Sequence, residues 1–111
     1  MATLSSHLLN SVNGTHAGGV KVIIYQINSS SNKKIFFETE TDDGGRIIKD
    51  FELSSDDCAC EYEMVCKTAD YFSEKKVVSE IIIKFKMEDP KKKYHLPIII
   101  SPNGYSIWWS N

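Results

Sequence analysis

Four side chains in this sequence have the chemistry to move a proton or hold an anion near neutral pH. They are His7, His16, His95 and Arg46, which is the only arginine beside twelve lysines. An imidazole titrates close to neutrality and can therefore serve as an acid or a base. A guanidinium offers a planar fork that matches an anion or a planar amide through paired hydrogen bonds. From the residues alone, however, a surface arginine at the start of a strand remains the preferred interpretation of Arg46.

The histidines differ in what their surroundings indicate. In "LSSHLLN", alternation groups His7 with Ser5 and Leu9, opposite Leu4 and Leu8, and an interface histidine without a catalytic role would also fit. His95 falls on the face of its predicted strand that points away from the expected core. His16 lies in a glycine-rich turn and is expected to be merely solvated. The sequence contains no GxSxG, P-loop, HExxH or EF-hand motif.

The elements that must position these residues have a period of two. Strands are predicted at 20–27, 34–41, 61–68 and 80–87, with glycine-, asparagine- and proline-rich turns between them. In the last of these, Ile81, Ile83, Phe85 and Met87 share one face. A single helix is predicted at 68–76, capped by Thr68 and closed by lysines. Many short strands with one brief helix indicate an antiparallel β-sandwich.

A hairpin is predicted at the end of the sequence, with strands at 94–101 and 105–111 joined by "SPNG". In its first strand, Tyr94, Leu96, Ile98 and Ile100 share one face, whereas His95, Pro97 and Ile99 share the other. In its second strand, Trp108 and Trp109 must point to opposite sides. We expect one indole to enter the core and the other to need a second cover, such as a subunit interface.

Composition sets outer limits on function. The 111 residues form one domain (1–111), with 41% hydrophobic and 25% charged residues, as in an ordinary globular protein. A net charge of -2 argues against nucleic acid or an acidic membrane as a partner, and no apolar run approaches the roughly 20 residues of a membrane span. Cys58, Cys60 and Cys66 are odd in number and include no CxxC pair, so we expect reduced thiols in a cytoplasmic chain without a metal.

Four segments together resemble the transthyretin-like family, and specifically its 5-hydroxyisourate hydrolase branch. They are "LSSHLLNSVNGTHAGGVKV", "TETDDGGRI", "TADYFSE" and "YHLPIIISPNGYS", in the order and spacing of that family. The resemblance implies a sandwich of two four-stranded sheets with one short helix. It also implies a homotetramer, built as a dimer of dimers around a channel that contains the active sites.

The resemblance further implies a reaction and its residues. These hydrolases open the six-membered ring of 5-hydroxyisourate, yielding 2-oxo-4-hydroxy-4-carboxy-5-ureidoimidazoline in urate degradation, without a metal or other cofactor. His7, Arg46 and His95 occupy the positions of the catalytic residues, and either histidine could be the base. The hormone-carrying branch has a lysine and a glutamate at the positions of His7 and Arg46, which favours the enzyme here.

The tail departs from the family pattern. Trp108 stands where the hydrolases have a substrate-pocket tyrosine, Trp109 where they have an arginine, and Asn111 where they have a terminal serine. An indole keeps an aromatic wall and one N–H donor but loses the phenolic hydroxyl. We expect Trp108, Asn111 and Ser106 to line the substrate site beside His7 and Arg46, with Trp108 plugging the channel floor. The alternative function is a weakened or inactive small-ligand-binding protein.

Overall fold

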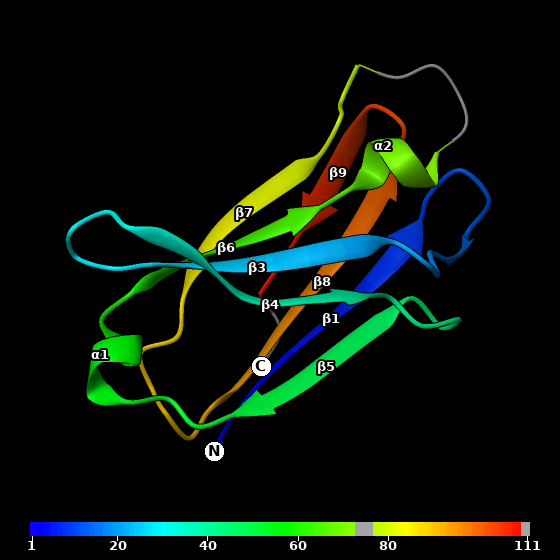
Figure 1. The fold of residues 1–111 in the computed structure, drawn as a ribbon. Coiled ribbons are helices and arrows are strands. Elements are labelled where there is room, and N and C mark those ends of the chain that lie inside the picture. The colour runs from blue at the N-terminus through cyan, green and yellow to red at the C-terminus, as the bar shows by residue number, and fades with distance from the viewer. Residues whose placement is uncertain (73–76, 110–111) are drawn as a thin grey trace.

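The computed structural model describes residues 1–72 and 77–109 of the chain, which form a two-layered β-sandwich with two short helices (Figure 1). The expected sandwich of two β-sheets is therefore confirmed. In chain order the elements are β1 (Ala2–Asn10), β2 (Thr15–His16), β3 (Lys21–Ile27), β4 (Lys33–Glu40), β5 (Arg46–Phe51), α1 (Ser55–Cys58), β6 (Glu61–Cys66), α2 (Thr68–Tyr71), β7 (Ile81–Lys86), β8 (Lys93–Ser101) and β9 (Gly104–Ile107).

The first sheet is organised around β1. On one side β1 pairs in parallel with β8, which pairs in turn with β9. On its other side β1 pairs with two strands in succession: β5 lies beside Ala2 to His7, and the short β2 lies beside Leu9 and Asn10. The expected sheet of four strands is thus β5, β1, β8 and β9, and the two-residue β2 is a fifth strand that was not predicted.

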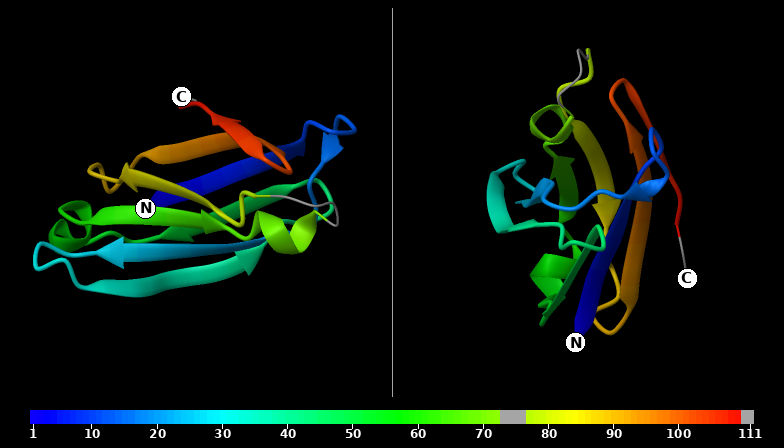
Figure 2. Two further views of the ribbon diagram at one scale, coloured as in Figure 1. Left: turned by 90° about the horizontal axis from the view of Figure 1, so that it is seen from above. Right: turned by 90° about the vertical axis from the view of Figure 1, so that its right-hand side faces the viewer.

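The second sheet has the order β4-β3-β6-β7, and all of its neighbours are antiparallel. It packs face to face against the first sheet (Figure 2). The buried core between the sheets draws on both layers, with fully buried side chains that include Leu4, Leu8, Ile24, Tyr62 and Ile98.

Alternating burial confirms the predicted faces of the strands. Along β1, Leu4 and Leu8 are buried against the core, whereas Ser5, His7 and Leu9 are only partly buried. In β7, Ile81 and the following Met87 are buried and the intervening lysines are exposed. In β8, the tyrosine and the aliphatic residues predicted for the core are all buried (Tyr94, Leu96, Ile98, Ile100).

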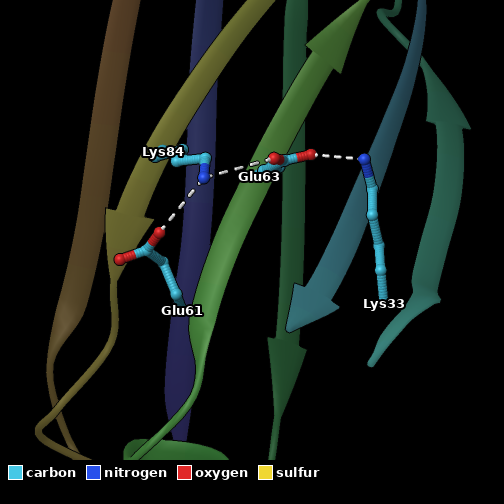
Figure 3. Close-up of polar contacts among 4 residues, drawn as sticks. All are labelled: Lys33, Glu61, Glu63 and Lys84. Carbon is cyan, nitrogen blue, oxygen red and sulfur yellow. Dashed lines mark ion pairs between the residues drawn. The ribbon is translucent and has the colours of Figure 1, made fainter. Parts of the chain in front are cut away.

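Ion pairs cross the second sheet around a largely buried carboxylate. Glu63 in β6 lies 2.7 Å from the Nζ of Lys33 and 3.8 Å from the Nζ of Lys84, while Glu61 lies 3.6 Å from Lys84 (Figure 3). The Glu63 side chain is only 9% exposed, whereas that of Lys84 is 61% exposed. Hydrogen bonding to Glu63 raises the pKa of Lys33. Lys33 from β4 and Lys84 from β7 thus neutralise a charge that would be costly to bury alone.

The two helices differ from the single helix that was predicted. α1 was not expected; Ser54 begins it with a capping box, in which Ser54 and Asp57 each accept a hydrogen bond from the other's backbone N–H. α2 spans only Thr68–Tyr71 and follows Lys67 as its N-cap, so the prediction that Thr68 is the cap was wrong. The Thr68 hydroxyl is buried in the first turn instead. The lysines predicted to close this helix lie outside the described residues.

No helix in residues 1–72 or 77–109 is long and apolar enough to cross a bilayer.

The tryptophans follow β9 and do not enter the core of the single chain. Trp108 and Trp109 are each 45% exposed, so the expectation that one indole would be buried in the core was wrong. The ring of Trp109 lies 5.9 Å from that of Tyr94, and the Nζ of Lys92 lies 5.1 Å from its centroid. Because β9 ends at Ile107, the ladder with β8 stops before the indoles, and Trp109 covers the rim of the core rather than its interior.

Candidate active site

The outer face of the first sheet brings His7, Arg46 and His95 together. His7 and Arg46 are direct partners in the antiparallel pairing of β1 with β5, so their side chains leave the sheet on the same face. His95 is the partner of Ser5 in the parallel pairing of β1 with β8, two residues along β1 from His7. Strand geometry places the Cα atoms of His7 and His95 about 8 Å apart. Residues from three strands that are distant in sequence thus share one patch.

Arg46 is positioned by the tight turn that precedes it. The Asp42 carboxylate accepts hydrogen bonds from the backbone N–H groups of Gly44 and Arg46, both at 2.9 Å. Gly45 adopts φ +74°, a left-handed conformation in which glycine carries no penalty. A Cβ on Gly45 would lie 2.4 Å from the carbonyl oxygen of Leu8, so the turn packs directly on β1. This close approach sets Arg46 beside His7.

His95 is held by a hydroxyl from the neighbouring strand. Its Nδ1 lies 2.8 Å from the Oγ of Ser5, which bonds the two strands at the level of the site. His95 is partly buried and Arg46 is exposed. With Nδ1 engaged by Ser5, the second ring nitrogen of His95, Nε2, is the one available to a substrate or a water molecule.

His16 also belongs to this patch, and the expectation that it is merely solvated was wrong. Its Nδ1 lies 2.9 Å from the Nε2 of His7, and the two rings stack with centroids 4.9 Å apart and 24° between their planes. The pairing of Leu9 with His16 in β1 and β2 creates this contact. The signal that could have predicted it is the "NG" of "SVNGTH", because an Asn-Gly turn folds the chain back beside the strand it has just left.

The environment of His7 favours its neutral form. Burial lowers its pKa below the ordinary value of 6.5, and the positive charge of Arg46 lowers it further. His16 and His95 act in the same direction, whereas a hydrogen bond to the backbone of Gly44 raises the pKa. Since the net shift is downward, His7 is predominantly uncharged at neutral pH.

The residues expected to line the substrate site from the tail are placed in part. Ser106 pairs with Ile99, so it lies on the same outer face as His95 and is exposed. Trp108 follows two residues later and is half-exposed. Asn111 lies outside the described residues.

The patch is an open face of the single chain rather than an enclosed pocket. A small cavity of about 90 Å³ lies elsewhere, under β4 and β5, and its lining includes the core residues Leu4 and Ile47. Within residues 1–72 and 77–109, no cluster of three histidine, cysteine, aspartate or glutamate side chains has the geometry to hold a metal ion. The chemistry available to the patch is that of imidazoles, a guanidinium and hydroxyls.

Comparison with known proteins identifies the family to which the chain is similar. A family model described as the HIUase/transthyretin family matches residues 4–109. The chain is 33% identical to a Caenorhabditis elegans protein named probable 5-hydroxyisourate hydrolase, over 96% of this chain and 80% of that protein.

Solved structures agree as well. The structure of Klebsiella pneumoniae 5-hydroxyisourate hydrolase superposes with a TM-score of 0.77 at 25% identity, covering all of both chains. Transthyretin from Sparus aurata superposes with a TM-score of 0.80 at 20% identity, covering 96% of this chain and 95% of the other, and therefore speaks for the fold.

Proposed function

This chain belongs to the HIUase/transthyretin family, and we propose that it is the enzyme that hydrolyses 5-hydroxyisourate to 2-oxo-4-hydroxy-4-carboxy-5-ureidoimidazoline in urate degradation. The observation that carries the proposal is the shared outer face on which His7, Arg46 and His95 meet. On that face, the guanidinium of Arg46 is a cationic hydrogen-bond donor, and the imidazole of His95 has a ring nitrogen, Nε2, that is available to a substrate or water. A general base for the attacking water and a cation for the developing negative charge are together able to hydrolyse a cyclic amide.

In the proposed mechanism, His95 is the general base. In the tautomer proposed for catalysis, the N–H at Nδ1 donates to the Oγ of Ser5, which leaves the lone pair of Nε2 to take a proton from the attacking water. The Nε2 of His7 faces His16 at 2.9 Å, so His7 is less suited to accept a proton from water in this arrangement. We assign His7 to orienting the substrate beside the leaving nitrogen.

Arg46 stabilises the negative charge that develops when water attacks the ring carbonyl. Its guanidinium can bind the planar anionic substrate through two parallel hydrogen bonds, which strengthen as the oxyanion forms. As the C–N bond breaks, the leaving nitrogen takes up the proton that His95 removed from the attacking water, and the ring opens. Loss of one such donor typically costs roughly a hundredfold in rate.

We further propose that the site is completed by other copies of the chain, in a homotetramer built as a dimer of dimers. The support is that Arg46 is exposed and the patch lies open in the single chain. Charged groups act far more strongly when water is excluded, and a second sheet laid over this face would exclude it. The exposed Trp108 would then cover the floor of the enclosed site beside Ser106. The test is to dilute the protein until sedimentation shows that it has dissociated into monomers, and to measure the activity per chain. Activity per chain that stays constant on this dilution would contradict the arrangement.

The decisive experiment follows the ultraviolet decay of freshly generated 5-hydroxyisourate, corrected for its spontaneous breakdown. His95→Ala and Arg46→Ala are each expected to lower kcat by roughly a hundredfold. Lys49→Ala, an exposed cation on the same strand as Arg46, is the matched control and should retain wild-type turnover. If both site variants match the wild type, the assignment of these residues is wrong.

A weakened or inactive protein that binds a small ligand is the second candidate, favoured only by the half-exposed indoles in the altered tail. Titration with thyroxine, an aromatic probe, separates the two functions. Tight binding by a protein that gives no turnover above spontaneous decay would support the binding function instead.

We propose a cytoplasmic location for the protein. All three cysteines are free, with Cys60 and Cys66 buried and Cys58 partly buried. Free thiols in a small domain fit a reducing compartment.

A further inference from the structure

We propose that His16 is a positioning residue for His7, which it holds in one ring orientation and one tautomer through the Nδ1–Nε2 hydrogen bond and the stacking of their rings. This role rests on the proposed function, because it concerns how the patch is prepared for catalysis. His16 itself is exposed at the rim of the patch, on a two-residue strand.

The contact between His16 and His7 depends on backbone pairing that fixes the position of His16. β2 is tied to β1 by the pairing of Leu9 with His16 and Asn10 with Thr15, and the N–H of Ala17 donates to the carbonyl of Leu8 at 2.9 Å. These bonds fix the backbone on both sides of His16. The planes of the two rings are 24° apart and their centroids are 4.9 Å apart, so the hydrogen bond joins two rings that are close to parallel.

The hydrogen bond between His7 and His16 couples their tautomers. The Nε2 of His7 and the Nδ1 of His16 lie 2.9 Å apart, and in two neutral rings one of these nitrogens must carry the hydrogen and the other must accept it. The proposed arrangement has the N–H at Nδ1 of His16 donating to Nε2 of His7, which leaves the hydrogen of neutral His7 on its Nδ1. A donor at Nε2 favours the neutral ring over the charged one.

The charges around His7 act in the same direction. Arg46 faces it from β5 and His95 from β8, and both favour the uncharged ring, as does His16 from β2. His16 differs from the other two because it also supplies a directed hydrogen bond. Its removal should therefore loosen the ring and raise the pKa of His7, without removing the groups assigned to chemistry.

Three substitutions separate the two parts of the contact. His16→Phe keeps a ring that can stack but has no donor. His16→Asn places an amide N–H near the position of Nδ1 without a full ring, and His16→Ala removes both. Thr15→Ala is the matched control, because it alters the same strand while leaving the histidine pair intact.

The first readout is nuclear magnetic resonance of the histidine rings in the wild-type protein and the variants, which does not depend on turnover. We expect nitrogen shifts of a single neutral tautomer for His7 in the wild type. In His16→Phe and His16→Ala, mixed tautomers and a higher pKa of His7 are expected. His16→Asn and Thr15→Ala should stay close to the wild type.

The second readout is 5-hydroxyisourate turnover as a function of pH. His16→Phe and His16→Ala should lower kcat by roughly fivefold, the scale of one hydrogen bond, with little change in KM. The acid limb of the profile should move to higher pH in step with the pKa of His7, and His16→Asn should restore most of the loss.

The outcomes distinguish the two proposals. A wild-type protein without turnover overturns the proposed hydrolase, and resonance then decides alone whether His16 controls His7. A wild-type protein with turnover, in which His16→Phe has the wild-type tautomer, pKa and pH profile, overturns the role of His16.

Discussion

Gly45→Ala tests whether the turn before Arg46 holds the site together. The new Cβ would lie 2.4 Å from the carbonyl oxygen of Leu8 and 3.0 Å from the backbone nitrogen of Ala17, in a residue with φ +74°. A left-handed alanine costs roughly 1–2 kcal/mol. Relieving the overlap displaces the Leu8–Gly45 and Ala17–Leu8 backbone bonds, each worth about 1 kcal/mol. We therefore expect the free energy of unfolding to fall by about 3 kcal/mol.

Gly19→Ala is the matched control for this substitution. Gly19 has nearly the same conformation, φ +75°, but nothing lies within 4 Å of a Cβ placed on it. Its alanine should cost only about 1 kcal/mol, which is the conformational share alone.

Urea denaturation of both variants at one protein concentration measures the difference, and the substrate-decay assay measures its effect on the site. Gly45→Ala should also lose more than about tenfold in kcat, because Arg46 and His7 shift apart. Equal destabilisation by the two alanines would refute the close-approach argument. Unchanged activity of a destabilised Gly45→Ala would show that the turn does not position Arg46.

Two further perturbations test the sheets. Glu63→Gln loses its ion pairs with Lys33 and Lys84 and should lower Tm by roughly 3–5 °C, whereas Glu61→Gln, on the same strand but more exposed, should change it less. Burial raises the pKa of the Cys66 thiol from its ordinary value of 9.0 to about 12. The folded protein therefore keeps this proton where the unfolded chain loses it, so the stability that it contributes is present below pH 9 and declines as the pH rises toward 12. Cys66→Ala should flatten that decline in denaturation curves, and an unchanged slope would contradict the burial argument.

Much of the fold and part of the site follow from period-two alternation. A strand with one buried face must place successive side chains on opposite sides, so the outward direction of His7 and His95 could be predicted from their buried neighbours. The position of Arg46 at the start of β5 could be predicted from the glycine turn before it. What brings these residues together is the pairing of β1 with both β5 and β8, which no local pattern specifies.

The errors occurred where a few residues depend on distant partners. β2 has only two residues and therefore no alternation to detect. His16 was for this reason assigned to solvent, although β2 pairs with β1 and places His16 opposite Leu9. α1 depends on the capping box of Ser54 rather than on an apolar stripe, and its residues include none that are buried. Trp109 lies on the side of the chain that faces Tyr94, as the alternation predicts. It stays outside the core because β9 ends two residues before it.

The hydroxyl of Ser5 and the ring of His95 are separated by 90 positions along the chain. During synthesis, the edge of β1 that pairs with β8 therefore stays unpaired until β8 has emerged from the ribosome. Catalytic activity would appear only after β1 and β8 have paired. The onset of 5-hydroxyisourate turnover during refolding would therefore report when folding is complete. Until then, the unpaired edge of β1 is also a surface to which a chaperone or a second nascent chain could bind by strand pairing.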